Sequence, residues 1–523
     1  MKNLKSILPK ELTIVDVYDF VTLSAVLGGL LYSYALLSFA LVFLAIRVLF
    51  IGRIGEKWIK IKQNKNVVLA LLSFFALHLI GLLWTENLTG GMTEINHKLP
   101  FLVVPIAVLV MSPVRKEIIK SLFWVYVTLL LFGTLWALFH YVSDQNVDTR
   151  ELIPFANTIR FGINIAFAIS LMLIAVFNDL KNMIRVCLLL GLTLWFVSFL
   201  FIIQALTGIV VLCILAIVAV VMFLVRKRTK MSYTLAVLLL MCLVIFCFVI
   251  RKEYKEYFTP KLMYVKALQP KTALGNYYTH VEDGFIENGC YVNQYVCEEE
   301  YIEAFKQRTG ITLDDDCGKI PDVLCKDVVK RYLNSKGLTK DAAGVKALTD
   351  KDIENIKSGN ANWIYAKRFS LMPRLYQTFF EFERYTHDGY FKDASVMQRF
   401  ELARNALSVV ADNPLIGVGT GDNVDKLKAY LDNNSHKSNF DSNDPHNYYL
   451  YIMVQFGVLG LVCLFFFLIY PPTKQKIWRS PVFQSLFVIT LSAMFVESFF
   501  NLFAMMMMYC LVSSLLLFNK DEL

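Results

Sequence analysis

The sequence predicts an all-α polytopic membrane protein, with about 12 transmembrane helices and one large external loop domain between the ninth and the tenth. Of its 523 residues, 56% are hydrophobic and 18% are charged, and its mean hydropathy is +0.51. These values are typical of polytopic membrane proteins rather than soluble ones. The net charge of +9 comes largely from short basic clusters between apolar runs. Membrane lipid is therefore an expected partner and nucleic acid is not.

Apolar runs long enough to cross a bilayer recur along the chain. A helix needs about 20 largely apolar residues to cross the hydrocarbon. On that rule, spans are expected at 15–32, 34–51, 66–84, 97–113, 119–142, 159–178, 184–204, 206–225, 232–250, 447–470, 481–499 and 501–518. The first two are the hardest to divide, because residues 20–50 are long for one span and short for two. Gly28, Gly29 and Tyr32 lie near the expected turn.

Lysines and arginines after the even-numbered spans orient the bundle. Cytoplasmic loops carry an excess of these residues, so these loops and both termini are predicted to be cytoplasmic. The clusters are Lys57, Lys60, Lys62 and Lys65; Arg115, Lys116 and Lys120; Lys181 and Arg185; Arg226, Lys227, Arg228 and Lys230; and Lys474, Lys476 and Arg479.

One long polar segment defines the predicted domains. Residues 1–250 hold spans 1–9 of the membrane bundle, and residues 447–523 hold spans 10–12. Residues 251–446 form the external loop. The loop contains a cysteine-bearing insertion at about 265–390, with enough apolar positions to fold as a small domain, and an amphipathic helix at 396–412.

Four of the ten cysteines fall in this loop. An even set in an external, oxidising compartment predicts two disulfides, with three possible pairings. The spacings do not match the short C-x2-C knuckles of zinc sites, so disulfides are favoured over a metal site. The candidates are Cys290, Cys297, Cys317 and Cys325.

A histidine stands at the mouth of the tenth span, in the stretch Asp444-Pro445-His446-Asn447-Tyr448. Imidazole can accept or hold a proton near neutral pH, and a helix N-terminus favours anions. His446 is therefore a candidate base or cation, with Asn447 and Tyr448 as candidate substrate contacts. A polar residue that only caps the span is equally compatible with the spacing.

The amphipathic helix before this histidine carries two arginines. Its apolar positions recur at helical spacing, at Phe400, Ala403, Leu407 and Val410. Arg399 and Arg404 border that face. Guanidinium groups suit phosphate oxygens, so both are candidate ligands of a lipid diphosphate. Contact with lipid headgroups or solvent is the alternative, and it is favoured for Arg404 more than for Arg399.

A proline- and glycine-rich turn, NPLIGVGTG, ends this helix. Gly417 and Gly419 permit positive φ and close backbone approach, which makes them candidate substrate contacts. The turn is not a phosphate-binding P-loop, because no Gly-Lys-Ser/Thr follows it.

Two further charged residues lie at predicted span ends. Arg160 opens the sixth span, where it is a candidate functional cation; alternatively, its side chain could extend to the membrane interface. Glu497 lies within the eleventh span near its external end, where an ionisable residue is costly unless functional or paired. One of the arginines is its expected partner. A metal site framed by His436, Asp441, Asp444 and His446 is a weak alternative, so no metal is predicted.

These motifs together resemble the O-antigen ligase and polymerase superfamily. The similarity is carried by RFELARNAL, NPLIGVGTG, DPHNYYL and FGVLGL, over roughly 396–462. The resemblance implies a helical membrane bundle in a bacterial inner membrane, without metal or cofactor. Its activity would move a glycan from undecaprenyl diphosphate to a hydroxyl of lipid A–core at the periplasmic face. His446 would then activate or orient the acceptor hydroxyl, or assist at the diphosphate. Arg160 and Arg399 would bind the diphosphate and stabilise the charge of the leaving group.

The chain departs from this family in two places, the cysteine-bearing insertion at about 265–390 and one motif. Many members carry a Ser-Arg pair between the seventh and eighth spans, where this chain has Gln204-Ala205-Leu206-Thr207-Gly208. The missing cation could come from Arg374 or Arg384. An O-antigen polymerase and a protein O-oligosaccharyltransferase share the signature, although the short loop at 143–158 favours a ligase. A transporter or flippase is the alternative from another class, and it is disfavoured because the spans are nearly free of charge at mid-depth.

Overall fold

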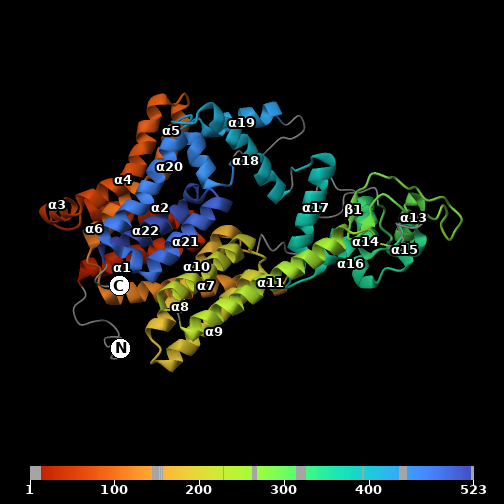
Figure 1. Ribbon diagram of the computed structural model, residues 1–523, viewed down its shortest axis with the longest axis horizontal. Coiled ribbons are helices and arrows are strands. Elements are labelled where there is room, and N and C mark those ends of the chain that lie inside the picture. The colour runs from red at the N-terminus through yellow and green to blue at the C-terminus, as the bar shows by residue number, and fades with distance from the viewer. Residues whose placement is uncertain are drawn as a thin grey trace. The chain divides into compact units, whose positions relative to one another are not determined.

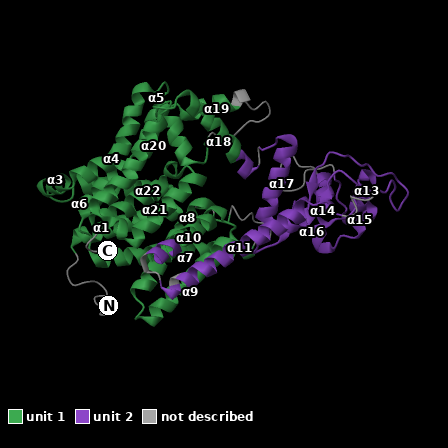
Figure 2. Ribbon diagram, in the orientation of Figure 1, with its two compact units in different colours: residues 1–219, 399–523 green, residues 220–398 purple. Residues whose placement is uncertain are grey.

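The computed structural model describes residues 13–143, 152–153, 155, 157–227, 229–261, 268–313, 325–391, 394–434 and 444–519. It is mostly helical and divides into two compact units (Figures 1 and 2). The first unit comprises Met1–Ala219 and Arg399–Leu523, and the second comprises Val220–Gln398. The chain therefore leaves the first unit once and returns to it at Arg399.

The first unit is a bundle of helices joined by short turns. Its elements are α1 (Ile14–Tyr32), α2 (Tyr34–Leu49), α3 (Ile54–Gln63), α4 (Lys65–Ile80), η1 (Gly81–Trp84), α5 (Leu88–Lys98), α6 (Pro100–Met111), α7 (Lys116–Ser143), α8 (Thr158–Asn178), α9 (Met183–Ile202), α19 (Asn423–Asn434), α20 (Tyr448–Gln475), η3 (Ile477–Arg479), α21 (Pro481–Val496), η4 (Phe499–Asn501) and α22 (Phe503–Phe518). Two more helices cross the unit boundaries, α10 (Leu206–Lys227) and α18 (Ser395–Asp412).

Each predicted span overlaps a helix. Among the described residues, nine helices are long and apolar enough to cross a membrane, which makes this a multi-pass membrane protein. The predicted span 34–51 ends early, because α2 and α3 meet at a bend of 100°. α21 and α22 are apolar but have only 16 residues each. The count of twelve stays a prediction.

Small residues and one ion pair hold α1 against α2. A Cβ on Gly29 would lie 2.7 Å from the Leu37 Cα, so the two helices meet at a distance that only glycine permits. Ser33 separates the helices and caps α2 by accepting a hydrogen bond from the Leu36 amide. Asp19 and Arg47 form a buried ion pair with an N–O distance of 2.7 Å. The turn predicted near Gly28 and Gly29 lies close to the observed break.

The second unit begins on a long apolar helix and ends in a small domain with its own core. Its elements are α11 (Lys230–Phe258), β1 (Ile286–Glu287), β2 (Cys290–Tyr291), α13 (Glu298–Thr309), α14 (Cys325–Lys336), α15 (Ala342–Lys346), α16 (Asp350–Lys357), η2 (Trp363–Ala366) and α17 (Met372–Asp388). β1 and β2 form an antiparallel hairpin in which Glu287 is opposite Cys290. Tyr301, Phe305, Val329 and Leu333 are among the buried residues of this core.

The loop cysteines do not all pair as expected. Cys325 is disulfide-bonded, and Cys317 lies outside the described residues. Cys290 and Cys297 are free, buried thiols, so the expectation of two disulfides is not met at these positions. The Cys290 Sγ lies 3.7 Å from the Asn288 carbonyl oxygen. Burial as a small apolar residue accounts for both free cysteines without a bridge.

Candidate functional site

The start of α20 holds His446 in an unusual backbone conformation. Asn447 caps the helix by accepting a hydrogen bond from the Leu450 amide at 3.1 Å. His446 precedes this cap with φ of +48°, in the left-handed region that few residues other than glycine adopt. The Asp444 carboxylate accepts a hydrogen bond from the His446 amide at 2.8 Å and stabilises this turn. The backbone therefore sets the direction of the imidazole.

A single carboxylate joins His446 to Arg399. Glu497 lies at the C-cap of α21, and its side chain is 8% exposed. Its Oε1 accepts from Arg399 Nη2 at 2.6 Å, and its Oε2 lies 3.3 Å from His446 Nδ1. A carboxylate that accepts from Nδ1–H holds the neutral imidazole in the tautomer that leaves Nε2 free to take a proton. The expected arginine partner of Glu497 is therefore Arg399.

Further hydrogen bonds tie the start of α20 to the end of α21. Ser498 Oγ donates to the Asp444 carboxylate, and Asn447 Nδ2 donates to the Phe495 carbonyl oxygen at 3.2 Å. The Tyr449 hydroxyl donates to the Leu491 carbonyl oxygen at 3.0 Å. These bonds fix His446 and Glu497 relative to each other before any substrate arrives.

Arg160 is a buried cation near the start of α8. Its side chain is among the largest fully buried ones. Nη2 donates to the Phe155 carbonyl oxygen at 3.0 Å, and the guanidinium carbon lies 4.6 Å from the centroid of the Tyr34 ring. Within the described ranges, Nε and Nη1 have no hydrogen-bond partner. Buried polar groups usually have partners, so these two nitrogens keep Arg160 a candidate anion ligand.

The glycine-rich turn packs against a break in α20. At Gly457 the backbone leaves helical geometry, with φ of 60° and ψ of −151°. There the Val458 amide donates to the Pro414 carbonyl oxygen at 2.9 Å, and the Val418 amide donates to the Val454 carbonyl oxygen at 3.0 Å. The turn therefore supplies hydrogen bonds to backbone groups around the interruption in α20.

The candidate contacts Gly417 and Gly419 have a packing reason to be glycine. Both have positive φ, of 65° and 104°. A Cβ on Gly417 would lie 2.4 Å from the backbone of Gln455, and one on Gly419 would lie 2.5 Å from Thr85 Oγ1. These approaches account for both glycines without a substrate, and their role as substrate contacts stays a prediction.

The family comparison falls on this part of the chain. Residues 363–465 match a family model described as O-antigen ligase. The resemblance to the O-antigen ligase superfamily is thus confirmed over a segment that holds Arg399, the glycine-rich turn and His446. A search of curated proteins found no match. The family supports a membrane glycosyltransferase related to O-antigen ligases and polymerases, with glycan and lipid substrates.

Within the segment that matches the O-antigen ligase family, the predicted amphipathic helix is present as α18. Leu402, Ala406 and Val409 are buried, whereas Phe400 and Leu407 are 59% and 53% exposed. Of the four apolar positions that predicted the helix, Val410 is also buried, so they are divided between the packed face and the exposed face. Spacing alone does not distinguish a face that contacts protein from one left for solvent or lipid.

The other predicted site residues lie in varied surroundings. Arg404 is exposed, and Tyr448 is fully buried, with no partner for its hydroxyl in the described part of the chain. In the second unit, Arg374 lies 3.9 Å from Glu381, and Arg384 lies 3.8 Å from the Tyr390 ring centroid. His436 and Asp441 lie outside the described residues. No group of three or more His, Cys, Asp or Glu side chains suited to a metal ion occurs among the residues that are described.

Sequence reasoning missed a buried ion pair that contacts the segment just after Glu497. Lys98 Nζ lies 3.0 Å from Glu94 Oε1, and the Lys98 side chain is 1% exposed. The same ammonium donates to the Phe500 carbonyl oxygen at 3.1 Å and to Asn501 Oδ1 at 2.8 Å. The signal was available, because Lys98 falls inside the predicted span 97–113, where a charge indicates pairing or function.

Proposed function

We propose that this protein is a glycan ligase that transfers a glycan from undecaprenyl diphosphate to a hydroxyl of lipid A–core. The observation that carries the proposal is the buried Glu497 carboxylate, which holds His446 and Arg399 together beside apolar helices. A proton acceptor and a cation on one carboxylate suit the attack of a hydroxyl on a glycosyl diphosphate. The match to the O-antigen ligase family over 363–465 supports the same reaction class.

In the proposed reaction His446 is the general base. Glu497 holds Nδ1–H, so the Nε2 lone pair takes the proton of the acceptor hydroxyl as its oxygen attacks the anomeric carbon. A new glycosidic C–O bond forms while the bond from the anomeric carbon to the diphosphate oxygen breaks. The electron pair leaves with undecaprenyl diphosphate. The His446 side chain is 28% exposed, which leaves room for a hydroxyl to approach.

Arg399 and Arg160 stabilise the departing diphosphate in this proposal. Negative charge grows on the leaving group in the transition state, and fixed cations lower that barrier. One Arg399 nitrogen is bound to Glu497, and the remaining N–H groups of the fork face phosphate oxygens. The buried Arg160 guanidinium has two nitrogens without partners in the described ranges, so it gains a counter-ion when the donor binds.

In this proposal the reaction takes place at the periplasmic face of the bacterial inner membrane. The basic loops after the even-numbered spans support cytoplasmic termini, with His446 at the external end of its span. The donor lipid and the lipid acceptor share this membrane, so both reach the site by diffusion within the bilayer.

The test is complementation of a strain that lacks the gene, with His446→Ala and Arg399→Ala checked for expression. Asp412→Ala is the control, because Asp412 lies on the same helix and is exposed. Loss of long glycan from lipid A–core, with polymerised glycan accumulating on undecaprenyl diphosphate, is the expected result for the first two variants. The control should ligate normally.

Other outcomes identify the alternatives. Single repeat units on the lipid would indicate an O-antigen polymerase. An unchanged ladder together with lost glycoproteins would indicate a protein O-oligosaccharyltransferase. An undiminished ladder and unchanged glycoproteins in both variants would contradict any glycosyltransferase reading and favour a transporter or flippase.

A further inference from the structure

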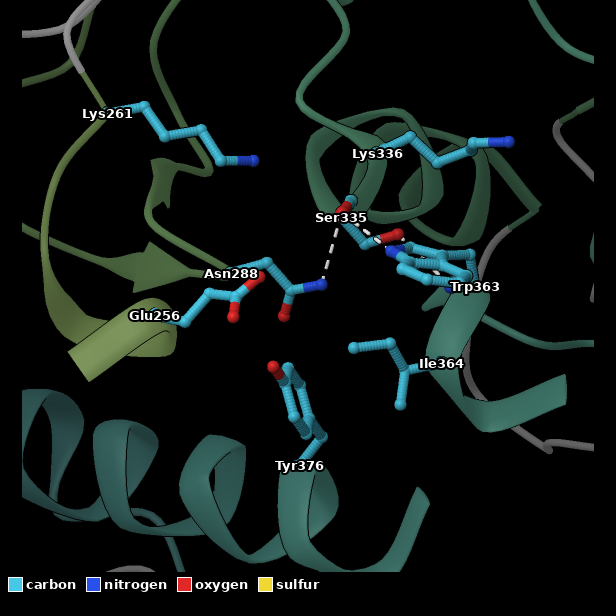
Figure 3. Close-up of a pocket in the computed structure, with 8 residues that line it drawn as sticks. All are labelled: Glu256, Lys261, Asn288, Ser335, Lys336, Trp363, Ile364 and Tyr376. Carbon is cyan, nitrogen blue, oxygen red and sulfur yellow. Dashed lines mark hydrogen bonds between the residues drawn. The ribbon is translucent and has the colours of Figure 1, made fainter. Parts of the chain in front are cut away.

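The second unit contains a cavity that none of the preceding chemistry uses. It has a volume of about 330 Å³ and is lined by Glu256, Lys261, Asn288, Ser335, Lys336, Trp363, Ile364 and Tyr376 (Figure 3). Glu256 lies near the C-terminal end of α11, an apolar helix long enough to span a membrane. The cavity is therefore built where the chain leaves a candidate span and enters the small domain.

The floor of the cavity is rigid because its polar groups bond to one another. Asn288 Nδ2 donates to the Ser335 carbonyl oxygen at 3.1 Å, and Asn362 Nδ2 donates to Asn288 Oδ1 at 3.1 Å. Trp363 Nε1 donates to the same Ser335 carbonyl at 3.1 Å, which fixes the indole (Figure 3). A preformed floor of this kind limits the entropy lost when a ligand binds.

Two charged side chains at the cavity are available to a ligand. Glu256 and Lys261 are exposed, and no hydrogen bond or ion pair engages either side chain among the described residues. The other polar side chains are committed: Lys336 Nζ lies 2.8 Å from Asp352 Oδ2, and the Tyr376 hydroxyl donates to Glu253 at 2.8 Å. Figure 3 shows the Lys336 ammonium pointing away from the other lining residues.

The lining combines flat apolar surface with polar groups. Trp363, Ile364 and Tyr376 supply aromatic and aliphatic area, while a carboxylate and an ammonium supply charge-assisted hydrogen bonds. A pyranose has the same division, with C–H groups on its faces and hydroxyls around its edge. The charges of Glu256 and Lys261 nearly cancel, so the cavity has little net charge. Binding of a polyanion, such as a nucleotide or a diphosphate, is therefore not favoured.

We propose that this cavity binds one hydroxyl-rich sugar residue of a glycan substrate. Its volume is at the low end of small-molecule pockets, roughly 300–1,000 Å³, which fits a single ring rather than a chain. A ring face packs on the Trp363 indole, and hydroxyls bond to Glu256 and Lys261. That the sugar belongs to a donor or acceptor glycan rests on the proposed function; the binding itself does not.

The experiment measures sugar binding to the full chain in lipid nanodiscs by ligand-detected NMR. The probes are methyl β-glucoside, N-acetylglucosamine and galacturonic acid. At least one should saturate with a Kd on the order of millimolar, as expected of a ligand this small. The double variant Glu256→Gln, Lys261→Met should weaken that binding by about tenfold or more, since it removes two charge-assisted hydrogen bonds.

Matched controls separate this proposal from the proposed function. Glu282→Gln with Lys346→Met changes the same charges at two exposed positions of the second unit that do not line the cavity, and it should bind like wild type. His446→Ala should also bind like wild type, whether or not it ligates. Absence of saturable binding by every probe would overturn the proposal. So would wild-type affinity in the cavity variant, or loss of binding in His446→Ala.

Discussion

Replacing Glu497 by glutamine is expected to reduce glycan transfer by about a thousandfold or more. Glutamine keeps the size of the side chain but removes the charge that Arg399 and His446 share. If its carbonyl oxygen stays on Arg399, its NH₂ group faces His446 Nδ1. The imidazole proton then moves to Nε2, and the proposed base loses its lone pair.

The magnitude follows from the two contacts and their burial. The bond from Arg399 is 2.6 Å long, the distance to His446 Nδ1 is 3.3 Å, and the carboxylate side chain is 8% exposed. A charge-assisted hydrogen bond contributes about 1.5–3 kcal/mol, which is roughly tenfold to a hundredfold in rate. The wrong tautomer adds to this, because comparable changes at a base-orienting carboxylate cost about 10⁴ in kcat.

The assay is transfer of radiolabelled glycan from purified undecaprenyl diphosphate donor to lipid A–core by protein in nanodiscs. Glu94→Gln is the matched control, since it also breaks a buried carboxylate–cation pair in the first unit, with Lys98. Glu94→Gln should lose at least as much thermal stability as Glu497→Gln, because it leaves the buried Lys98 ammonium without its carboxylate, whereas Arg399 is partly exposed. Only Glu497→Gln should lose transfer out of proportion to that stability loss.

Transfer by Glu497→Gln within about threefold of wild type would refute the assignment. The carboxylate would then stabilise the fold without orienting the base. Equal losses in Glu497→Gln and Glu94→Gln would lead to the same conclusion, since a shared loss of stability would explain both.

Three further predictions follow from burial and backbone geometry. Arg160→Met should leave the thermal unfolding midpoint unchanged or raised, since burying an unpaired cation costs folding energy. Donor binding, measured by titration, should weaken at least tenfold. A large drop in the unfolding midpoint would contradict this prediction. Gly417→Ala should lower the free energy of unfolding by about 1–3 kcal/mol or more in thermal unfolding, because φ is +65° and the added Cβ meets backbone. The control Gly191→Ala, which has open space around it, should not lower it. Burial lowers the pKa of Lys340 to about 7, so the unfolded chain binds more protons between pH 7 and about 10. Unfolding free energy should therefore rise through that window by up to about 1.4 kcal/mol per pH unit, and denaturant titrations of Lys340→Met should lack the rise.

Much of the helical architecture could be predicted from the sequence. Apolar runs locate helices well, because a span must satisfy its own backbone hydrogen bonds and is therefore helical and largely apolar. Breaks within an apolar segment are harder to predict. The 100° bend between α2 and α3 depends on how the two helices pack, and an apolar run with this composition is equally compatible with a straight helix.

For the candidate site, the sequence predicts individual residues but not the contacts between them. His446 and Glu497 could be selected because they lie at the ends of predicted spans. Arg399 could be selected because it borders the apolar face of a predicted amphipathic helix. The Glu497 carboxylate contacts both Arg399 and His446. Because Arg399 and Glu497 lie almost 100 positions apart, no local sequence pattern predicts this contact. The sequence also selects Arg160, but its burial, and the lack of hydrogen-bond partners for two of its nitrogens among the described residues, depend on packing and could not be predicted from sequence.

The cysteines and the apolar face of α18 show what composition leaves open. Four cysteines in an external loop favour two bridges on statistical grounds, but Cys290 and Cys297 fill small core positions instead. On α18, Phe400 and Leu407 follow the expected spacing and remain exposed. In a membrane protein an exposed apolar side chain can contact lipid, so apolar spacing does not identify the protein core.

The glycine-rich turn connects the two elements that carry the proposed chemistry. Arg399 lies on α18, His446 precedes α20, and the turn ends α18 and bonds to α20 at the Gly457 break. Those hydrogen bonds are possible only because Gly417 and Gly457 let two backbones meet at contact distance. The turn therefore sets the position of Arg399 relative to His446 without touching either. A glycine substitution there should lower transfer through misplacement of the arginine, even in protein that remains folded.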